Sequence, residues 1–341
     1  MSHDALPLDA VRRDLQARSA FGEGREQERD GGQHRRGQAG GCSASFHAPI
    51  TGPGSPAVKR GGRGLPWLLA ACLLLAGCGG AKLVYGQLDV LLPWYFRDYV
   101  DLDTGQRRNL ERAVDGLLAW HRESEVGRYA VFFRELERDA AQPLGLDRIR
   151  SARLELDAFW DDIARRMAPD AAALLSTLSD AQVEGLFVRM AEDDAKLARE
   201  ASGRSREERV ERREKALRRQ LERWVGRLDD RQQGLIAACA TELGADPAGW
   251  IASRQAWAGA LREALADRQD LSRLTPRLAR LLADGEAFWD PEYRRQFDAD
   301  RDRVIRLFAD IDDSLTARQR DTLRRRLGEL ALDFEAIAGG A

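Results

Sequence analysis

The hydrophobic and polar positions of the chain follow a helical period over most of its length after residue 78. Two apolar stripes illustrate it, one through Phe132, Phe133, Leu136 and Ala140 before Pro143, and one through Val304, Leu307, Phe308 and Ile311. Apolar residues three and four positions apart share one face of an α-helix, whereas a half-buried strand alternates with a period of two. No run of this sequence alternates in that way, and β-branched residues are scarce. The pattern therefore predicts an all-α protein built as an elongated multi-helix bundle.

A third apolar stretch predicts where one helix ends. Apolar residues continue from Ile149 to Met167, and Pro169 follows them. Proline has no backbone N–H and its ring clashes with the carbonyl four residues earlier. We therefore expect this helix to end before Pro169.

A five-residue pattern recurs at four predicted helix starts. Each copy holds an apolar residue, then Asp, Ser or Thr, two variable residues and a glutamine, at residues 102–106, 178–182, 228–232 and 315–319. In a capping box the first polar side chain accepts a hydrogen bond from the amide three residues on, and the glutamine accepts one from the cap's own amide. The pattern predicts four capped helix starts. It also resembles the Leu-Thr-x-x-Gln-like motif of small periplasmic Spy-like chaperones, which are helical and cradle unfolded clients, although the uneven spacing excludes a solenoid.

A short apolar run at residues 65–76 has the composition of a secretory signal. Lys59, Arg60 and Arg63 precede it, and small residues follow it. About 20 apolar residues are needed to span a bilayer, so this run favours a cleavable signal peptide over a transmembrane helix. It ends in Leu-Ala-Gly-Cys at Gly77 and Cys78, which resembles the lipobox of bacterial lipoproteins.

The lipobox resemblance implies a membrane anchor at Cys78. The signal would be cut between Gly77 and Cys78, the Cys78 thiol would carry a diacylglyceryl group, and the new amino terminus would carry a fatty acyl group such as palmitate. Gly79 follows, with no Asp at the second mature position. By resemblance to sorted lipoproteins, we expect the chain on the periplasmic side of the outer membrane of a Gram-negative bacterium.

Residues 1–57 do not fit an ordinary signal peptide. They are rich in Gly, Arg, Gln and Ser and contain few large apolar residues. Such a segment cannot bury enough surface to offset its chain entropy. Either it is a disordered leader, or translation starts at Val58 from a GTG codon. The predicted organisation is therefore a leader at 1–57, a signal peptide at 58–77 and one helical domain at 78–341.

Charge and cysteine content narrow the possible partners. The 341 residues carry a net charge of −2, and the part after the signal is mildly acidic, so overall charge argues against nucleic-acid binding. Of the four cysteines, Cys42 and Cys72 precede the predicted cut and Cys78 is the predicted lipidation site. Only Cys239 is left, which excludes an intramolecular disulfide. It lies in an apolar helical stretch, where we expect a buried thiol.

Two surface candidates stand out. Trp94, Tyr95, Phe96 and Tyr99 cluster shortly after the predicted anchor. Trp and Tyr favour membrane interfaces, but such a cluster also suits a protein core. The second candidate is the arginine-rich segment at 204–227, which also carries an apolar stripe. It predicts a solvated amphipathic helix or a docking face for anionic lipid, lipopolysaccharide or an acidic partner.

Candidates for catalysis are few. His121 is the only histidine after the signal, which argues against a multi-histidine metal site, and no Gly-x-Ser-x-Gly elbow or glycine-rich phosphate loop follows. We expect Trp120 to pack and His121 to lie at a helix end. An acidic series at Asp298, Asp300 and Asp302 lacks the loop glycine of an EF-hand. We predict no catalytic, cofactor-binding or metal-binding residue, and keep Trp120 and His121 with the aromatic cluster as a possible interface.

Several ordered blocks together resemble a known family. They are Leu83-Val84-Tyr85, Tyr99-Val100-Asp101-Leu102, Trp120-His121-Arg122, Trp224-x-Gly226-x-Leu228 and Leu315-Thr316-x-x-Gln319-Arg320. They are similar to an uncharacterised family of proteobacterial lipoproteins, domain of unknown function 6279. The resemblance implies helices and lipid anchoring but no activity. We expect a non-enzymatic protein-interaction, envelope-assembly or chaperone-like factor; the alternatives are an adaptor for one envelope partner or anionic lipid and, third, a hydrolase.

Overall fold

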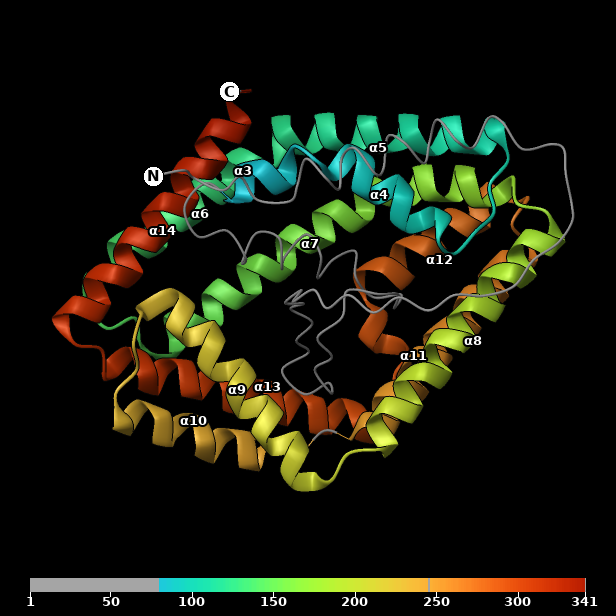
Figure 1. Ribbon diagram of the computed structural model, residues 1–341. Helices are drawn as coiled ribbons and strands as arrows, with labels where there is room; N and C mark the ends of the chain where they lie inside the picture. The colour runs from blue at the N-terminus through green and yellow to red at the C-terminus, as the bar shows by residue number, and fades with distance from the viewer. Residues whose placement is uncertain (1–79, 245, 341) are drawn as a thin grey trace, which may run out of the picture. The chain divides into compact units, whose positions relative to one another are not determined.

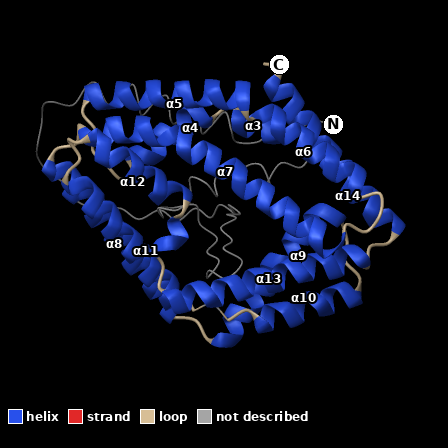
Figure 2. Ribbon diagram, turned by 180° about the vertical axis from the view of Figure 1, so that it is seen from behind, coloured by secondary structure: helices blue, strands red, loops and turns tan. Residues whose placement is uncertain are grey.

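The computed structural model describes residues 80–244 and 246–340, and the elements in these ranges are all helices (Figures 1 and 2). The prediction of an all-α, multi-helix protein is confirmed for this part of the chain. The predicted leader at 1–57, the signal peptide at 58–77 and the lipidation site at Cys78 lie outside the described residues. No helix among those described is both long and apolar enough to cross a membrane.

The helices follow one another with short connections. In chain order they are α3 (Gly80–Tyr85), α4 (Leu88–Arg97), α5 (Thr104–Ser124), α6 (Val126–Asp139), α7 (Gly145–Ser176), α8 (Asp180–Ser202), α9 (Arg206–Val225), α10 (Asp230–Glu242), α11 (Pro247–Ala266), α12 (Leu271–Ala283), the 3₁₀ helix η1 (Gly285–Phe288), α13 (Pro291–Asp313) and α14 (Ala317–Ala338).

The four predicted capping boxes are confirmed as helix starts. Asp103, Ser179, Asp229 and Thr316 each cap a helix, and in each the glutamine three residues on accepts from the cap's amide. A fifth box, with a glutamate in place of the glutamine, begins α9 at Ser205. Each box satisfies two amides that would otherwise lack a partner at the helix start, so short local motifs set these boundaries.

The prediction that Pro169 ends a helix is wrong, because α7 runs through it without interruption. Pro169 is exposed, and Ala168 and Ala172 on either side of it are buried. An interior proline costs a helix about 3 kcal/mol. Burial of large side chains such as Leu174 and Leu175, each worth about 1.5–3 kcal/mol, outweighs that cost when the helix continues.

Within the described residues, the buried side chains form three large clusters and a small aromatic one. The first cluster includes Leu178 and Leu265, the second is centred on Phe334, and the third includes Ile236 and Ile311. A few half-buried side chains touch two clusters: Leu92 and Leu118 join the first to the second, and Trp224 and Leu323 join the second to the third. The described helices are therefore stabilised by several local cores rather than by one continuous core.

Several helix pairs connect the halves of the described chain, and two of them involve the last helix of a half. In the first half (α5–α8), α6 packs against α14 and α8 packs against α11, and both partners belong to the second half (α10–α14). Figure 1 shows each of these pairs side by side, and Figure 2 shows the same from behind. The last helix of each half thus covers an earlier helix of the other half, so the two halves are intertwined.

Candidate functional site

A hydrogen-bonded cluster fixes the first described helix to the rest of the protein. Tyr85, at the end of α3, places its hydroxyl 3.1 Å from Nδ1 of His121 and 3.2 Å from the carbonyl oxygen of Leu118, both on α5. Nε2 of His121 lies 3.0 Å from the hydroxyl of Tyr129 on α6. All three ring side chains are buried. We call Tyr85, His121 and Tyr129 the α3 clamp.

The partners of the α3 clamp assign its protons. The Tyr85 hydroxyl donates to the Leu118 carbonyl, so it accepts from His121, whose Nδ1 then carries the hydrogen. Nε2 is left to accept from the Tyr129 hydroxyl. Burial lowers the pKa of His121 to about 4, which keeps the ring neutral as this arrangement requires. Burial also raises the pKa of Tyr85 to about 12, so both phenols keep their protons.

A charged group borders the α3 clamp at the junction of α5 and α6. Arg128 lies 2.6 Å from Glu125 and 2.7 Å from Asp162 of α7. Burial raises the pKa of Glu125, and the Arg128 guanidinium opposes that shift. Arg128 also lies over the Phe159 ring at 5.1 Å. These contacts tie α5, α6 and α7 together on the side of His121 that faces Tyr129.

The predicted interface residues do not share one surface. Of the aromatic cluster, Trp94 is exposed, Tyr95 and Phe96 are half-buried and Tyr99 is buried. The Tyr99 hydroxyl donates to Asp193 of α8 at 2.7 Å, which makes it a core contact. The cluster therefore divides between the core and the surface.

The Trp120–His121 pair lies at the end of α5, and the histidine is part of the core. His121 lies in the last turn of α5, as expected, but it is the more buried of the two, whereas Trp120 is half-buried. As a core residue His121 cannot contribute to a surface interface. Its contact with Tyr85 was not predictable from the sequence, because the two residues lie 36 positions apart along the chain.

The four capping glutamines meet in two reciprocal pairs. Nε2 of Gln106 donates to Oε1 of Gln182 at 3.2 Å, and Nε2 of Gln182 donates back to Gln106 at 2.7 Å. Gln232 and Gln319 do the same at 3.1 and 2.8 Å. We call these the reciprocal glutamine pairs. Sequence reasoning identified the boxes but not their pairing, which joins segments 76 and 87 positions apart.

Each glutamine also bonds the backbone that leads into its partner's helix. Gln106 donates to Thr177 and Gln182 to Asp101, at 2.9 and 2.6 Å. In the second pair Gln232 donates to Ser314 and Gln319 to Arg227, at 3.3 and 2.8 Å. In every case the accepting carbonyl lies two positions before the partner's cap residue. Both amide hydrogens are thus used within the protein, so the pairs serve structure rather than ligand binding.

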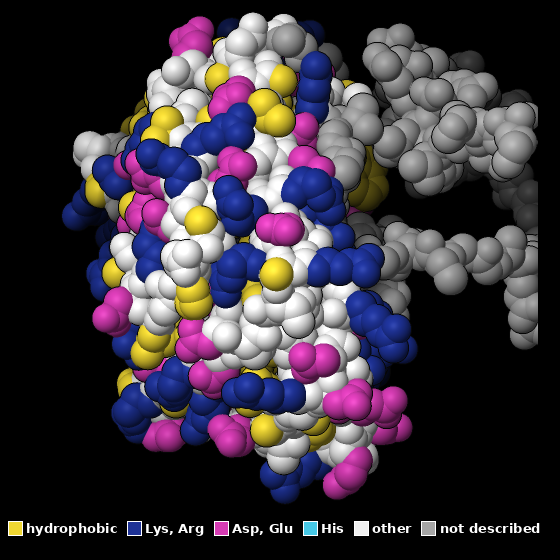
Figure 3. Space-filling model, turned by 90° about the vertical axis from the view of Figure 1, so that its left-hand side faces the viewer, with side chains coloured by type: hydrophobic (Ala, Val, Ile, Leu, Met, Phe, Trp, Pro, Cys, Tyr) yellow, Lys and Arg dark blue, Asp and Glu magenta, His cyan; other side chains and the backbone are white. Residues whose placement is uncertain are grey.

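The arginine-rich segment is an amphipathic helix, α9. Leu217 and Leu221 of the predicted apolar stripe are buried, and so is Val225. Burial and the nearby guanidinium of Arg326 lower the pKa of Arg223, so positive charges crowd at this point. On the face of the protein in Figure 3, however, basic and acidic side chains are interspersed. The prediction that α9 docks an anionic group stays a prediction.

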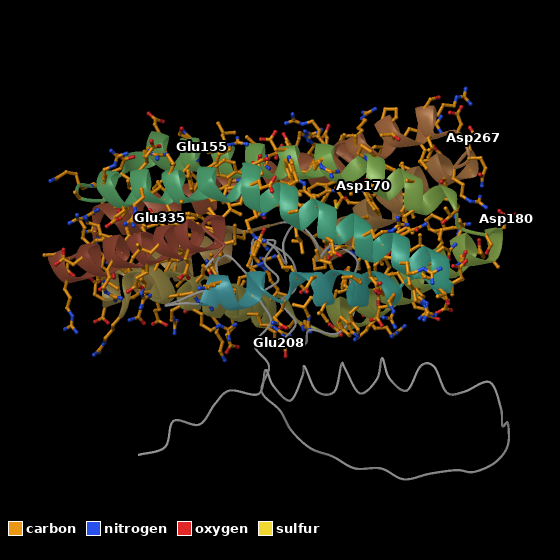
Figure 4. The ribbon with its side chains drawn as sticks, turned by 90° about the horizontal axis from the view of Figure 1, so that it is seen from above. Glu155, Asp170, Asp180, Glu208, Asp267 and Glu335 are labelled. Carbon is orange, nitrogen blue, oxygen red and sulfur yellow. The ribbon has the colours of Figure 1, made fainter. Side chains whose placement is uncertain are left out.

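Carboxylates are numerous but are held by local partners. Figure 4 labels six that come from different parts of the ribbon rather than from one cluster. Five of them lie within 3.4 Å of an arginine: Glu155, Asp170, Asp180, Asp267 and Glu335. The sixth, Glu208, accepts a hydrogen bond from the Ser205 amide and so completes a helix cap. No group of three or more metal-ligating side chains occurs in the described ranges.

Cys239 and the acidic series on α13 also have structural surroundings. The Cys239 thiol is buried, as expected, and burial raises its pKa to about 11. Asp300 is fully buried and accepts hydrogen bonds from the Gly244 amide at 3.0 and 3.1 Å and from Arg303 at 2.8 Å. It closes the connection after α10. The α3 clamp, together with the side of α4 on which Trp94 is exposed, is the candidate functional site.

Comparison with known proteins identifies a family but no activity. No curated protein and no solved structure matches the chain. A family of unknown function, DUF6279, matches residues 98–294, from the end of α4 into α13. That match covers more than half of the sequence. It includes Gln106, Gln182 and Gln232 of the reciprocal glutamine pairs but not Gln319. The chain therefore belongs to the DUF6279 family of unknown function.

Proposed function

We propose that the chain is a lipoprotein held on the periplasmic side of the outer membrane through lipids on Cys78, and that it acts there by binding a protein partner rather than by catalysis. The α3 clamp is the observation that carries this proposal. It fixes Tyr85, seven positions after Cys78, to the bodies of α5 and α6. A lipid anchor at Cys78 would then hold the folded body itself at the membrane.

The length of chain between anchor and body supports a short attachment. α3 begins at Gly80, two positions after Cys78. Two residues span at most about 7 Å, so the start of α3 would lie beside the lipid headgroups. A protein held so closely is suited to partners that share or approach the same membrane.

The first half of α7 offers a surface for such a partner. Between residues 145 and 162 no side chain is fully buried, and Leu154 and Leu156 expose 68% and 43% of their surface. Exposed leucines on a well-formed helix gain free energy when a partner covers them. Residues two positions apart point to different sides of a helix, so we place the partner-binding site on the more exposed side, at Leu154.

Two measurements test the proposal. Mass spectrometry of the protein purified from membranes should find diacylglyceryl and acyl groups on Cys78 and none on Cys78→Ser. A photo-crosslinking amino acid at Leu154 should capture a discrete envelope protein, whereas the same label at exposed Arg165 on the same helix should not. An unlipidated Cys78, or equal crosslinking from Leu154 and Arg165, would contradict it.

A chaperone-like role is the second candidate, favoured by the same exposed leucines and by the Spy-like motifs. It predicts that purified Cys78→Ser protein suppresses aggregation of several unfolded clients. The double variant Leu154→Ser, Leu156→Ser should lose that effect, and Val188→Ser, which alters an exposed side chain of α8, should keep it. Many weak crosslinks from Leu154 would favour this role, and one strong crosslink the adaptor role. A hydrolase using His121 has the least support, because both ring nitrogens already bond phenols.

A further inference from the structure

The outer face of α4 carries an apolar row that the fold does not use. Val90 and Trp94 are one helical turn apart and expose 44% and 46% of their surface, and exposed Arg97 continues the row. The opposite face already attaches the helix: Leu88 is buried, and Leu92 packs against two of the cores. Residues three or four apart share a helix face, so these are two separate rows. We call Val90, Trp94 and Arg97 the outer row.

The position of α4 in the chain indicates what covers the outer row. α4 begins ten positions after Cys78, and α3 lies between them. The α3 clamp holds one end of this segment, and Leu88 and Leu92 hold the other. With lipids on Cys78, the segment would be confined to the headgroup region and could not swing away from the body. Figure 1 shows α3 and α4 following one another beside α5.

The chemistry of the outer row suits a lipid surface. Tryptophan favours the bilayer interface, where its ring is partly in hydrocarbon and its N–H reaches the headgroups. Arginine at the edge of such a face can keep its stem in the interface and its charge at the phosphates. Exposed Lys82 on α3 adds a second positive charge near the anchor.

We propose that the outer row of α4 seats in the headgroup region of the phospholipid bilayer that holds the Cys78 lipids. This inference rests on the proposed lipid anchoring. With one contact at Cys78 and a second at Trp94, the body is held in a fixed orientation. Exposed Leu154 of α7 is then presented to partners at a constant angle.

Tryptophan fluorescence quenching tests the seating directly. The full lipidated protein is reconstituted into vesicles of phosphatidylethanolamine and phosphatidylglycerol that carry bromine at a shallow acyl position. Trp94 is the one exposed tryptophan among the described residues. We expect shallow bromines to quench the wild type and Trp94→Phe to lose that quenching. Equal quenching of the two proteins would overturn the seating.

Charge variants give a second readout with a matched control. Trp94→Glu should release α4 from the bilayer, seen as faster proteolysis of membrane-bound protein near residue 94, and Leu332→Glu on α14 should not. Equal proteolysis of both variants overturns the seating. Lipid on Cys78 is measured by mass spectrometry in every sample, which separates the two proposals. If Cys78 carries no lipid, the proposed anchoring is wrong. If the protein is lipidated but Trp94 is not quenched, only the seating of α4 is wrong. Contact of Trp94 with a protein instead of lipid would also overturn only the seating.

Discussion

The buried histidine of the α3 clamp should give the protein a distinct response to acid. Because the pKa of His121 is about 4 in the fold and about 6.5 when unfolded, the unfolded state binds a proton first as pH falls. The contribution of neutral His121 is present above pH 6.5 and is lost as pH falls towards 4. We expect the free energy of unfolding to drop by up to about 3 kcal/mol over this range for this residue. Urea unfolding at pH 7 and pH 4.5 measures it.

A His121→Gln variant isolates this effect from the carboxylates. Burial raises the pKa of Asp193 and Asp312, so these groups bind protons more readily in the fold and oppose the loss. They are unchanged in the variant. The difference between wild type and variant should therefore shrink as pH falls, and a constant difference would refute the assignment.

Of the four glutamines in the reciprocal glutamine pairs, Gln232 is the one whose loss should lower the free energy of unfolding most. It is fully buried and bonds Gln319, Ser314 and the amide of Asp229. Gln232→Ala removes these bonds and leaves buried Gln319 without its side-chain partner, and a buried unsatisfied group costs about 1–3 kcal/mol. We expect a loss of about 2–4 kcal/mol in denaturant unfolding. The neighbouring Gln233→Ala, which removes one 3.3 Å bond to Leu228 from a half-buried side chain, should cost under about 1 kcal/mol.

A double-mutant cycle tests whether each pair acts as a unit. Once Gln232 is removed, Gln319 has already lost one donor and one acceptor. The second substitution should then cost at least about 0.5 kcal/mol less than it does alone. Simple additivity would mean that the two glutamines stabilise their own helix starts independently.

At the scale of the helix, replacing either of two glycines of α11 by alanine should change the thermal stability in opposite directions. A Cβ at Gly249 would lie 3.1 Å from Cγ of the buried Tyr293 ring, whereas one at Gly259 would meet nothing within 4 Å. Alanine stabilises an open helix position by about 0.5–1 kcal/mol. We expect Gly259→Ala to raise the melting temperature. Gly249→Ala should lower it, because overpacking costs about 1–3 kcal/mol. A rise in both would show that Tyr293 moves aside freely.

Helix starts were predictable from sequence because a capping box is complete within four residues. Both partners of Asp103 or Thr316 lie in the same short segment, so its chemistry can be read without the fold. The course of α7 through Pro169 was not predictable in this way. It depends on α12 and α13, which pack along α7 but lie more than a hundred positions later.

The candidate site shows the same division. The exposure of Trp94 follows from the side of α4 that meets the cores, and Tyr99 is buried because the chain after α4 enters the first core. Period alone did not reveal which side of α4 that is. The partners of His121 come from α3 and α6, so its role depends on tertiary packing. The sequence identified the residue types but not which of them meet.

At the scale of the whole described chain, the order of the caps matches the intertwined halves. An Asp box opens each half, at Asp103 and Asp229, and a Ser or Thr box precedes the last helix of each, at Ser179 and Thr316. Each half also closes its own glutamine pair. The packing of the last helices, by contrast, joins the two halves, because α8 lies on α11 and α14 lies on α6. The two halves thus share one order of caps, and the last helix of each packs on the other half.

Splitting the chain between α8 and α9 tests this arrangement. Gly203 and Ser205 are exposed, so a break between α8 and α9 falls in an exposed connection. Fragment 79–203 keeps one glutamine pair but loses α11 and α14, on which its α8 and α6 pack. Fragment 204–341 keeps the other pair but loses α8 and α6. We expect neither fragment alone to unfold cooperatively, and the two to co-purify and recover a cooperative helical transition when co-expressed. Thermal circular dichroism and size-exclusion chromatography measure this. A cooperative transition in either fragment alone would mean that the glutamine pair and its local core suffice, and that crossing over of the last helices is not what holds the halves together.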